Sequence, residues 1–342
     1  MPPPPSDQST IYLARSQLQR NGDMMSSEPR QREVYFNGRY VPESQASVSI
    51  YDSALMFGDM AFEFTRTFKH KPFRLREHLD RLYASMKILR IDPGMSLDEM
   101  EKVTLEVLEH NAPLVQPEID FQILHDISRG VLGPYQRVIG NERDATGPTV
   151  AISTYPMDLH LASFAPLFDE GVRAVIPRQR AIPSHLLDAK MKTRSRQHYQ
   201  IANQQTSDVD PKAWAVLIDM DGFIAEGTGA NVFVVIDGVL YTPERRNILR
   251  GVSRGAVFDL ANELGIDCHE RNLDPYDMHT ADEAFFTSTP FCMVSITHLD
   301  GLPISEGAPG PIVKQLLDAW SKLVGVDIPG QARWCAEHVK GT

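Results

Sequence analysis

The chain has 342 residues, 42% of them hydrophobic and 23% charged, as expected for a globular protein of two domains. Its net charge of −11 argues against nucleic acid or an anionic membrane as a partner, and no apolar run reaches the roughly 18 residues of a membrane-spanning helix. The three cysteines, Cys268, Cys292 and Cys335, are widely spaced, which argues against a disulfide framework or a zinc site and favours a reducing cytoplasm.

The first 30 residues, rich in Pro, Ser, Gln and Arg, predict a mobile tail without chemistry, and they lack the apolar core of a signal peptide. After the tail, X-Gly pairs between apolar runs predict antiparallel hairpins, because the two-residue turn needs positive φ at both central residues. The four pairs are Asn37-Gly38, Asp221-Gly222, Asp237-Gly238 and Asp300-Gly301. Antiparallel sheet is therefore expected near the start and throughout the second half.

Helices are predicted between these hairpins. Apolar residues recur at helical spacing from Leu79 to Leu89 and again from Val257 to Leu264. Ser96 and Glu99 form a capping-box pattern ahead of Met100, which predicts the start of a further helix.

The predicted elements divide the chain into two parts. We expect a small α+β domain over residues 31–152 and a larger domain, rich in antiparallel strands, over residues 164–342. A linker is expected over residues 153–163, where Pro156 interrupts the pattern after the strand Thr149–Ile152. No GxGxxG motif opens a helix after a strand, so a Rossmann unit is not expected.

A cluster of cations follows Leu187, with Lys190, Lys192, Arg194 and Arg196 within seven positions. The plainest interpretation is a solvated basic strand edge. Neighbouring cations also lower the pKa of a lysine and make it a nucleophilic amine. Lys190 and Lys192 would share one face of a strand, so spacing alone does not choose between them.

Glu226 stands where a predicted hairpin strand meets the glycine-rich turn Gly227-Thr228-Gly229. The apolar residues Ile224 and Val232 suggest buried surroundings. A buried carboxylate needs a partner, and a protonated ring nitrogen would serve, although an exposed turn glutamate is the simpler alternative.

Two further segments carry groups suited to an anion. Gly251-Val252-Ser253 leads into the predicted helix at Val257, and N–H groups at a helix start bind anions, although most such ends bind only water or their own cap. Arg81 could add a positive charge, or it could pair with Glu77 four residues earlier on a helix surface.

Together these segments resemble the class IV (fold type IV) pyridoxal-phosphate enzymes: branched-chain and D-amino acid aminotransferases, (R)-amine transaminases and aminodeoxychorismate lyases. The resemblance covers roughly residues 33–325. It is carried by the segments Phe57–Glu63, Glu77–Ser85, Lys192 with Ala202-Asn203-Gln204, Glu226–Phe233, Leu249–Arg254 and Thr287–Thr289. It implies a small α/β first domain, a larger pseudo-barrel second domain built on antiparallel sheet, and a homodimer.

The resemblance also implies roles around pyridoxal 5′-phosphate. Lys192, in register with Ala202-Asn203-Gln204, resembles the lysine that holds this cofactor as a Schiff base. Glu226 resembles the acid that keeps the pyridine nitrogen protonated. The remaining cofactor-binding positions are Arg81, Val252, Ser253 and Thr289 at the phosphate and Leu249 on the ring face.

The substrate side departs from the family patterns. Pro134 and Tyr135 stand where D-amino acid aminotransferases carry an Arg-x-His carboxylate trap. Gln122 and Gln197 replace an arginine and a tyrosine of branched-chain aminotransferases, and Pro290 has no N–H to offer. The candidate substrate residues are Phe62 and Arg66, from a Phe-Glu-x-x-Arg similarity, and the spare cations Arg129, Arg194 and Arg196, any of which could pair with a carboxylate.

These implications predict a cytoplasmic aminotransferase that moves the amino group of a branched-chain L-amino acid to a 2-oxo acid such as 2-oxoglutarate by a ping-pong mechanism. The alternatives of the same fold are an aminodeoxychorismate lyase that releases pyruvate, an (R)-amine transaminase and a D-amino acid transaminase. A non-catalytic cofactor-binding protein is the alternative of a different class.

Overall fold

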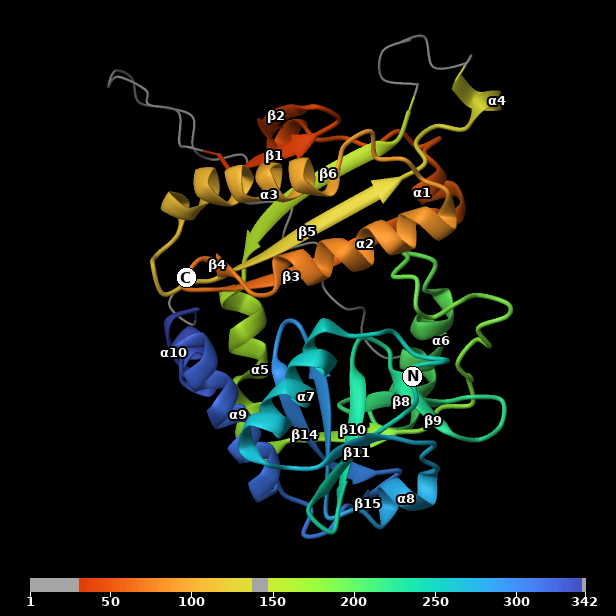
Figure 1. Cartoon of the computed structure of the whole chain (residues 1–342), viewed down its shortest axis with the longest axis vertical. Coiled ribbons are helices and arrows are strands. Elements are labelled where there is room, and N and C mark those ends of the chain that lie inside the picture. Colours follow the sequence, from red (N-terminus) through yellow and green to blue (C-terminus); the bar gives the residue numbers. More distant parts are fainter. Residues whose placement is uncertain (1–30, 137–146, 340–342) are drawn as a thin grey trace, which may run out of the picture. The chain divides into compact units, whose positions relative to one another are not determined.

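The computed structural model describes residues 31–136 and 147–339, and the tail expected at residues 1–30 lies outside them. The described chain from Arg32 onward forms one unit that contains two β-sheets, each covered by helices (Figure 1). This is the α+β arrangement expected from the sequence.

The first sheet is antiparallel throughout, with the strand order β2-β1-β6-β5-β3-β4. Helices α2 and α3 cover one of its faces (Figure 1), where Leu79 and Leu82 of α2 and Met100 of α3 pack against Ile123 of β5. Its strands are β1 (Glu33–Phe36), β2 (Arg39–Pro42), β3 (Met60–Phe68), β4 (Lys71–Pro72), β5 (Phe121–Ser128) and β6 (Thr149–Pro156).

The second sheet has the order β12-β11-β10-β13-β14-β7-β8-β9, with β15 paired to β14. It is largely antiparallel, but three pairs of strands are parallel: β7 with β8, β11 with β12, and β7 with β14. Parallel neighbours need a long connection, which contains α6 between β7 and β8 and α7 between β11 and β12. Its strands are β7 (Val172–Val175), β8 (Trp214–Ile218), β9 (Ile224–Gly227), β10 (Asn231–Ile236), β11 (Val239–Thr242), β12 (Cys268–Glu270), β13 (Glu283–Ser288), β14 (Cys292–Leu299) and β15 (Leu302–Pro303).

The second sheet curls back on itself. Strand β9 forms one end of the sheet, yet a tight turn joins it to β10 in the interior, where Gly227 N–H donates to the Ala230 carbonyl at 2.8 Å. On one face of this sheet, α7 and α9 bury Leu260 and Trp320 against Phe233 and Phe285, whose rings stack at 5.0 Å.

The helices follow the expected signals. The capping box of Ser96 and Glu99 begins α3, and both apolar stripes become helices, α2 and α7. The helices and 3-10 turns are η1 (Glu43–Gln45), α1 (Ser53–Phe57), α2 (Leu75–Leu89), α3 (Leu97–Asn111), η2 (Ala112–Leu114), α4 (Gly133–Gln136), α5 (Asp158–Glu170), α6 (Gln197–Val209), α7 (Val252–Leu264), α8 (Pro275–His279), α9 (Pro311–Val324) and α10 (Ile328–Val339).

Three of the four predicted two-residue turns are present, each with positive φ at both central residues: Asn37-Gly38, Asp237-Gly238 and Asp300-Gly301. The prediction was wrong in detail at Asp221-Gly222, where β8 and β9 are joined by the longer loop 219–223. The cause is Asp219, whose carboxylate accepts from the N–H groups of Asp221 and Phe223 and closes the loop.

The segment that we expected to link two domains, residues 153–163, contains the end of β6 and the start of α5. The division into domains over 31–152 and 164–342 stays a prediction. Hydrogen bonds connect the first sheet to segments that adjoin the second. Among them, Phe62 N–H of β3 donates to the Lys192 carbonyl at 3.0 Å, and Arg66 donates to the Pro290 carbonyl at 2.7 Å.

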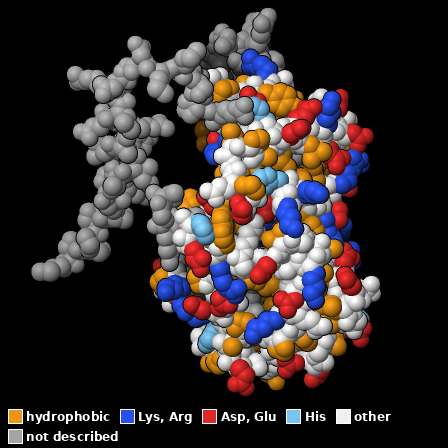
Figure 2. Space-filling view, turned by 90° about the vertical axis from the view of Figure 1, so that its left-hand side faces the viewer, with side chains coloured by type: hydrophobic (Ala, Val, Ile, Leu, Met, Phe, Trp, Pro, Cys, Tyr) orange, Lys and Arg blue, Asp and Glu red, His pale blue; other side chains and the backbone are white. Residues whose placement is uncertain are grey.

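The surface carries both signs of charge, and acidic and basic side chains are interspersed on the face in Figure 2. Among the described residues, none of the helices is long and apolar enough to cross a membrane. In the same residues, no cluster of three or more His, Cys, Asp or Glu side chains is arranged to hold a metal ion.

Candidate active site

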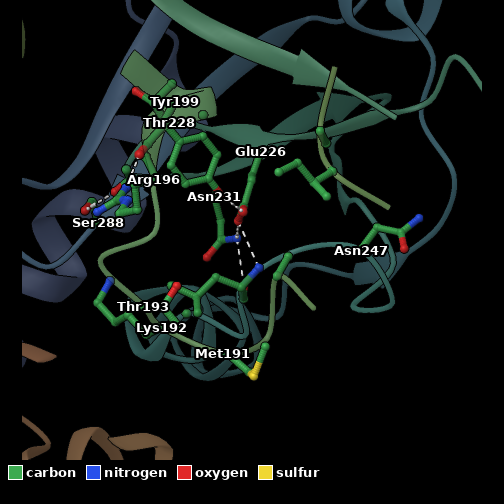
Figure 3. Close-up of a pocket in the computed structure, with 18 of the residues that line it drawn as sticks. Met191, Lys192, Thr193, Arg196, Tyr199, Glu226, Thr228, Asn231, Asn247 and Ser288 are labelled. Carbon is green, nitrogen blue, oxygen red and sulfur yellow. Dashed lines mark hydrogen bonds between the residues drawn. The ribbon is translucent and has the colours of Figure 1, made fainter. Parts of the chain in front are cut away.

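A cavity lies where the first sheet meets the second. Phe62 of β3 and Arg81 of α2 contribute from one side, and residues of the second sheet, α6 and the start of α7 contribute from the other. Figure 3 shows Lys192, Arg196 and Glu226 around this cavity. Its charged lining residues are Arg81, Asp188, Lys192, Arg196 and Glu226.

Lys192 belongs to this lining, and Lys190 does not. Instead the Lys190 amine pairs with Asp188 at 2.7 Å and donates to the Arg246 carbonyl at 3.1 Å. The expectation that both lysines share a strand is wrong, because only Thr193 of this segment forms a β-bridge, to Ala61. The geometry thus separates two lysines that the sequence left as alternatives.

Lys192 has one contact at its backbone and one at its amine. Its backbone N–H donates to Ser85 Oγ at 3.1 Å, and its amine nitrogen lies 4.7 Å from the centre of the Phe62 ring. Burial, and then the positive charge of Arg81, lower the pKa of this amine from 10.5 to about 7. Lys192 therefore has a substantial neutral, nucleophilic fraction at neutral pH.

Glu226 is buried at 5% exposure, which rules out the exposed turn glutamate. Its carboxylate accepts from the Leu249 N–H at 2.9 Å, from Tyr199 Oη–H at 2.8 Å and from the Asn231 amide at 3.3 Å. Burial raises the pKa of Glu226 above its usual value, and the Leu249 and Tyr199 hydrogen bonds oppose that shift. A cationic ring nitrogen is the partner that such a carboxylate suits.

The sequence did not point to Tyr199, because branched-chain aminotransferases carry their tyrosine five residues after the lysine, where this chain has Gln197. The structure brings in Tyr199 from the first turns of α6, seven residues after the lysine, where it lines the cavity beside Glu226. The available signal was an aromatic hydroxyl near the start of the helix that follows the lysine segment.

Arg81 lines the cavity, and hydrogen bonds to two other residues hold its guanidinium in place. Its Nε and Nη2 donate to the two oxygens of Glu63 at 2.6 and 2.7 Å, and Nη1 donates to the Arg250 carbonyl at 2.9 Å. The surface pair with Glu77 is absent, because Glu77 lies 3.6 Å from Arg74 instead. Burial alone would raise the pKa of Glu63, but the charge of Arg81 outweighs it and holds that pKa well below the usual range.

The start of α7 faces the same cavity with Val252 and Ser253, and no side chain caps it. Gly251, its N-cap, leaves room for the Asn231 side chain, because an added Cβ would lie 2.2 Å from the Asn231 amide oxygen. Ser253 forms no side-chain hydrogen bond within the described parts of the chain. Together with Thr289 and Arg81, these N–H and hydroxyl groups form a donor set that fits a phosphate.

The other residues predicted from the sequence fall into two groups, those that line the cavity and those that do not. Phe62, Leu249 and Arg196 line the cavity, whereas Arg66 and Arg129 do not. Arg66 is buried, with its guanidinium on the Pro290 carbonyl and on Gln331 at 2.8 Å.

Arg129 pairs with Asp59 at 2.7 Å and also donates to the Leu89 carbonyl. The sequence could not anticipate these partners of Arg66 and Arg129, because they lie 40 to 265 positions away in the chain.

Comparisons with known proteins identify the family of the chain. The family model described as amino-transferase class IV matches residues 60–299. A provisionally named branched-chain-amino-acid aminotransferase of Methanocaldococcus jannaschii is 36% identical over 296 residues, which cover 85% of this chain and 96% of that protein.

Solved structures also match, and two of them illustrate the similarity. The branched-chain amino acid aminotransferase of Escherichia coli has a TM-score of 0.77 at 28% identity, over 86% of this chain and 95% of that one. The branched-chain amino acid aminotransferase of Thermobaculum terrenum, in its PLP-bound holo form, has a TM-score of 0.73 at 26% identity, over 89% of this chain and 96% of that one. These matches confirm the expected fold, and the chain belongs to the class IV aminotransferase family and is an aminotransferase.

Proposed function

We propose that this aminotransferase binds pyridoxal 5′-phosphate at Lys192 and moves the amino group of a branched-chain L-amino acid to a 2-oxo acid such as 2-oxoglutarate. The observation that carries this proposal is a lysine amine with a pKa of about 7 that shares one cavity with Glu226 and with the phosphate-type donor set around Arg81. Two half-reactions on one amine carrier predict ping-pong kinetics.

Each role follows from the chemistry of a side chain. When bound, pyridoxal 5′-phosphate supplies an electron sink that acidifies the Cα–H bond of the amino acid. Glu226 would hold the ring nitrogen and its proton, and Leu249 would cover the ring. Arg81, Ser253, Thr289 and the N–H groups at Val252 and Ser253 would hold the phosphate. The Lys192 amine, in its neutral form, would take the proton from Cα and deliver it to C4′ of the cofactor.

The choice of a branched-chain substrate rests on two supports. The relatives and structures described above carry that activity in their names. The cavity wall also offers apolar surface from Phe62, Ile182, Leu187 and Met191, which suits an aliphatic side chain.

A substrate panel tests the proposal. L-leucine with 2-oxoglutarate should yield glutamate. Double-reciprocal plots of initial rate against leucine concentration, measured at several acceptor concentrations, should give parallel lines. D-alanine, an (R)-amine and aminodeoxychorismate form the comparison arms. Release of pyruvate from aminodeoxychorismate without an acceptor would favour the lyase, and no reaction with any donor would leave the proposed function without support.

We further propose that the enzyme is a cytoplasmic homodimer. Apolar side chains are exposed in and before α1, with Ile50 at 69%, Leu55 at 67% and Phe57 at 62%, as expected of a surface covered by a second copy. Cys268, Cys292 and Cys335 are all free, as in a reducing compartment. Light scattering and mutation of Leu55 to Asp would test the dimer.

A further inference from the structure

Arg196 is an arginine of the cavity that forms no ion pair with an acidic side chain among the described residues. Arg81 is paired with Glu63, and the acidic lining residue Asp188 is paired with Lys190. Arg196 donates to the Thr228 carbonyl, and none of the described side chains forms a hydrogen bond or salt bridge with it. A half-buried guanidinium in this position retains free donors for an anion.

The guanidinium is nevertheless fixed in position. Its central carbon lies 4.9 Å from the centre of the Tyr199 ring and 5.5 Å from that of Phe62, so it is bounded by two aromatic faces. The Thr228 turn that accepts its hydrogen bond is itself held by α6, because Thr228 Oγ1–H donates to the Asn203 side chain at 2.9 Å. A cation held in this way binds an anion without first losing its own freedom.

Arg196 is also close to the reacting amine. The Lys192 nitrogen and the Arg196 guanidinium both lie against the Phe62 ring, and they lie on the same side of the cavity in Figure 3. Ser288 is next to Arg196 in that view and donates to the Gly229 carbonyl, beside the Thr228 carbonyl that Arg196 binds.

The other candidate cations are already committed. Arg194 forms an ion pair with Asp126 at 2.8 Å and stacks on Phe62 without lining the cavity. Arg129 is paired with Asp59. Pro290, just after β13, has no N–H to donate, and its carbonyl is taken by Arg66. Of these arginines, Arg196 is the one that lines the cavity and forms no ion pair among the described residues.

We propose that Arg196 binds the α-carboxylate of the amino acid and of the oxo acid, and that this contact makes the enzyme selective for amino acids over simple amines. The inference rests on the proposed function, since it names the residue by which that site would choose its substrates. A guanidinium suits this task because its planar N–H groups match the two oxygens of a carboxylate.

The test uses the holoenzyme of wild type, Arg196→Gln and Arg194→Gln. Glutamine keeps a donor for the Thr228 carbonyl but removes the charge, and Arg194 is the matched control two residues away on the same segment. The probes are L-leucine, 3-methylbutylamine, which is leucine without its carboxylate, and 4-methylpentanoate, which lacks the amine. Cofactor content is measured by absorbance in every sample.

Arg196→Gln should raise the KM for L-leucine and the calorimetric Kd for 4-methylpentanoate by about 100-fold, the size of a lost charge-assisted contact. Activity with 3-methylbutylamine and the cofactor content should change by less than about threefold, and Arg194→Gln should match wild type within that margin.

Unchanged KM and Kd values in Arg196→Gln would overturn the inference, as would equal losses with leucine and with the amine. An equal loss in Arg194→Gln would overturn it too, because the effect would then belong to the segment. If wild type transaminates no amino acid at all, the proposed function fails. If wild type is active and Arg196→Gln has the same KM and Kd values as wild type, the Arg196 inference alone fails.

Discussion

The Glu63 carboxylate accepts hydrogen bonds from both N–H groups on one edge of the Arg81 guanidinium, at 2.6 and 2.7 Å. The Glu63 side chain is fully buried. His78 Nδ1 lies 2.9 Å from the same carboxylate. Glu63 and Arg81 are 18 positions apart, on β3 and α2, so this pair fixes the helix to the sheet as well as orienting the cation toward the cavity.

Glu63→Gln should destabilise the apoprotein at pH 7 by roughly 3–5 kcal/mol, because it leaves a buried guanidinium without its counter-charge. The folded-state pKa of Glu63 lies below its unfolded value near 4.5, so its contribution is complete above that pH and is lost as the pH falls further. Thermal unfolding should therefore show a gap between wild type and variant that shrinks from pH 7 to pH 3.5. Glu77→Gln, on the exposed face of α2, is the control, and a gap that is constant with pH would contradict the account.

Arg81→Gln should weaken binding of pyridoxal 5′-phosphate by about 10- to 100-fold, the cost of one charge-assisted hydrogen-bonding group. Fluorescence titration of the apoprotein measures this. Arg129→Gln should bind the cofactor as wild type does, because its guanidinium is occupied by Asp59. Equal affinities for wild type and Arg81→Gln would remove Arg81 from the phosphate site.

The lowered pKa of Lys192 predicts a pH profile. Pyridoxal, which lacks the phosphate, should attach to the apoprotein at a rate that rises with pH and levels off above about 7, because attachment needs the neutral amine. With an ordinary lysine the rate would keep rising with pH and would level off only above about 10.5. Stopped-flow absorbance from pH 5.5 to 9 measures the profile, and a rate that continues to climb tenfold per pH unit up to pH 9 would show that the amine is not perturbed.

Tyr199→Phe should slow the half-reaction with L-leucine by roughly tenfold while cofactor affinity stays within about threefold. The reason is that the hydroxyl steadies the Glu226 carboxylate at 2.8 Å but is not part of the phosphate donor set. Single-turnover absorbance and cofactor titration separate the two effects. An unchanged half-reaction rate would show that the Tyr199–Glu226 hydrogen bond is without influence on the chemistry.

Local features of the fold could be predicted from the sequence because their causes are local. Asn37-Gly38 and Asp237-Gly238 specify their turns by positive φ, and the capping box at Ser96 and Glu99 needs only four consecutive residues. The loop at Asp221-Gly222 differed because a carboxylate two positions earlier, Asp219, changed the turn.

The site could be predicted only in part. The resemblance pointed to Lys192, Glu226, Arg81 and Ser253, and the structure brings these side chains to one cavity. Arg66 and Arg129 look equally available in the sequence, yet partners far along the chain engage them. The contacts of Tyr199 with Glu226 and of Arg81 with Glu63 likewise depend on tertiary packing, which no local pattern encodes.

The proposed function depends on Lys192 as the residue that carries the cofactor. The direct measurement is borohydride reduction of the holoenzyme, followed by digestion and mass mapping of the labelled peptide. We expect one adduct per chain, on Lys192, which is retained in Lys190→Ala and absent from Lys192→Ala. The half-reaction of Lys192→Ala should also slow by several orders of magnitude. An adduct on Lys190, or unchanged turnover in Lys192→Ala, would contradict this assignment.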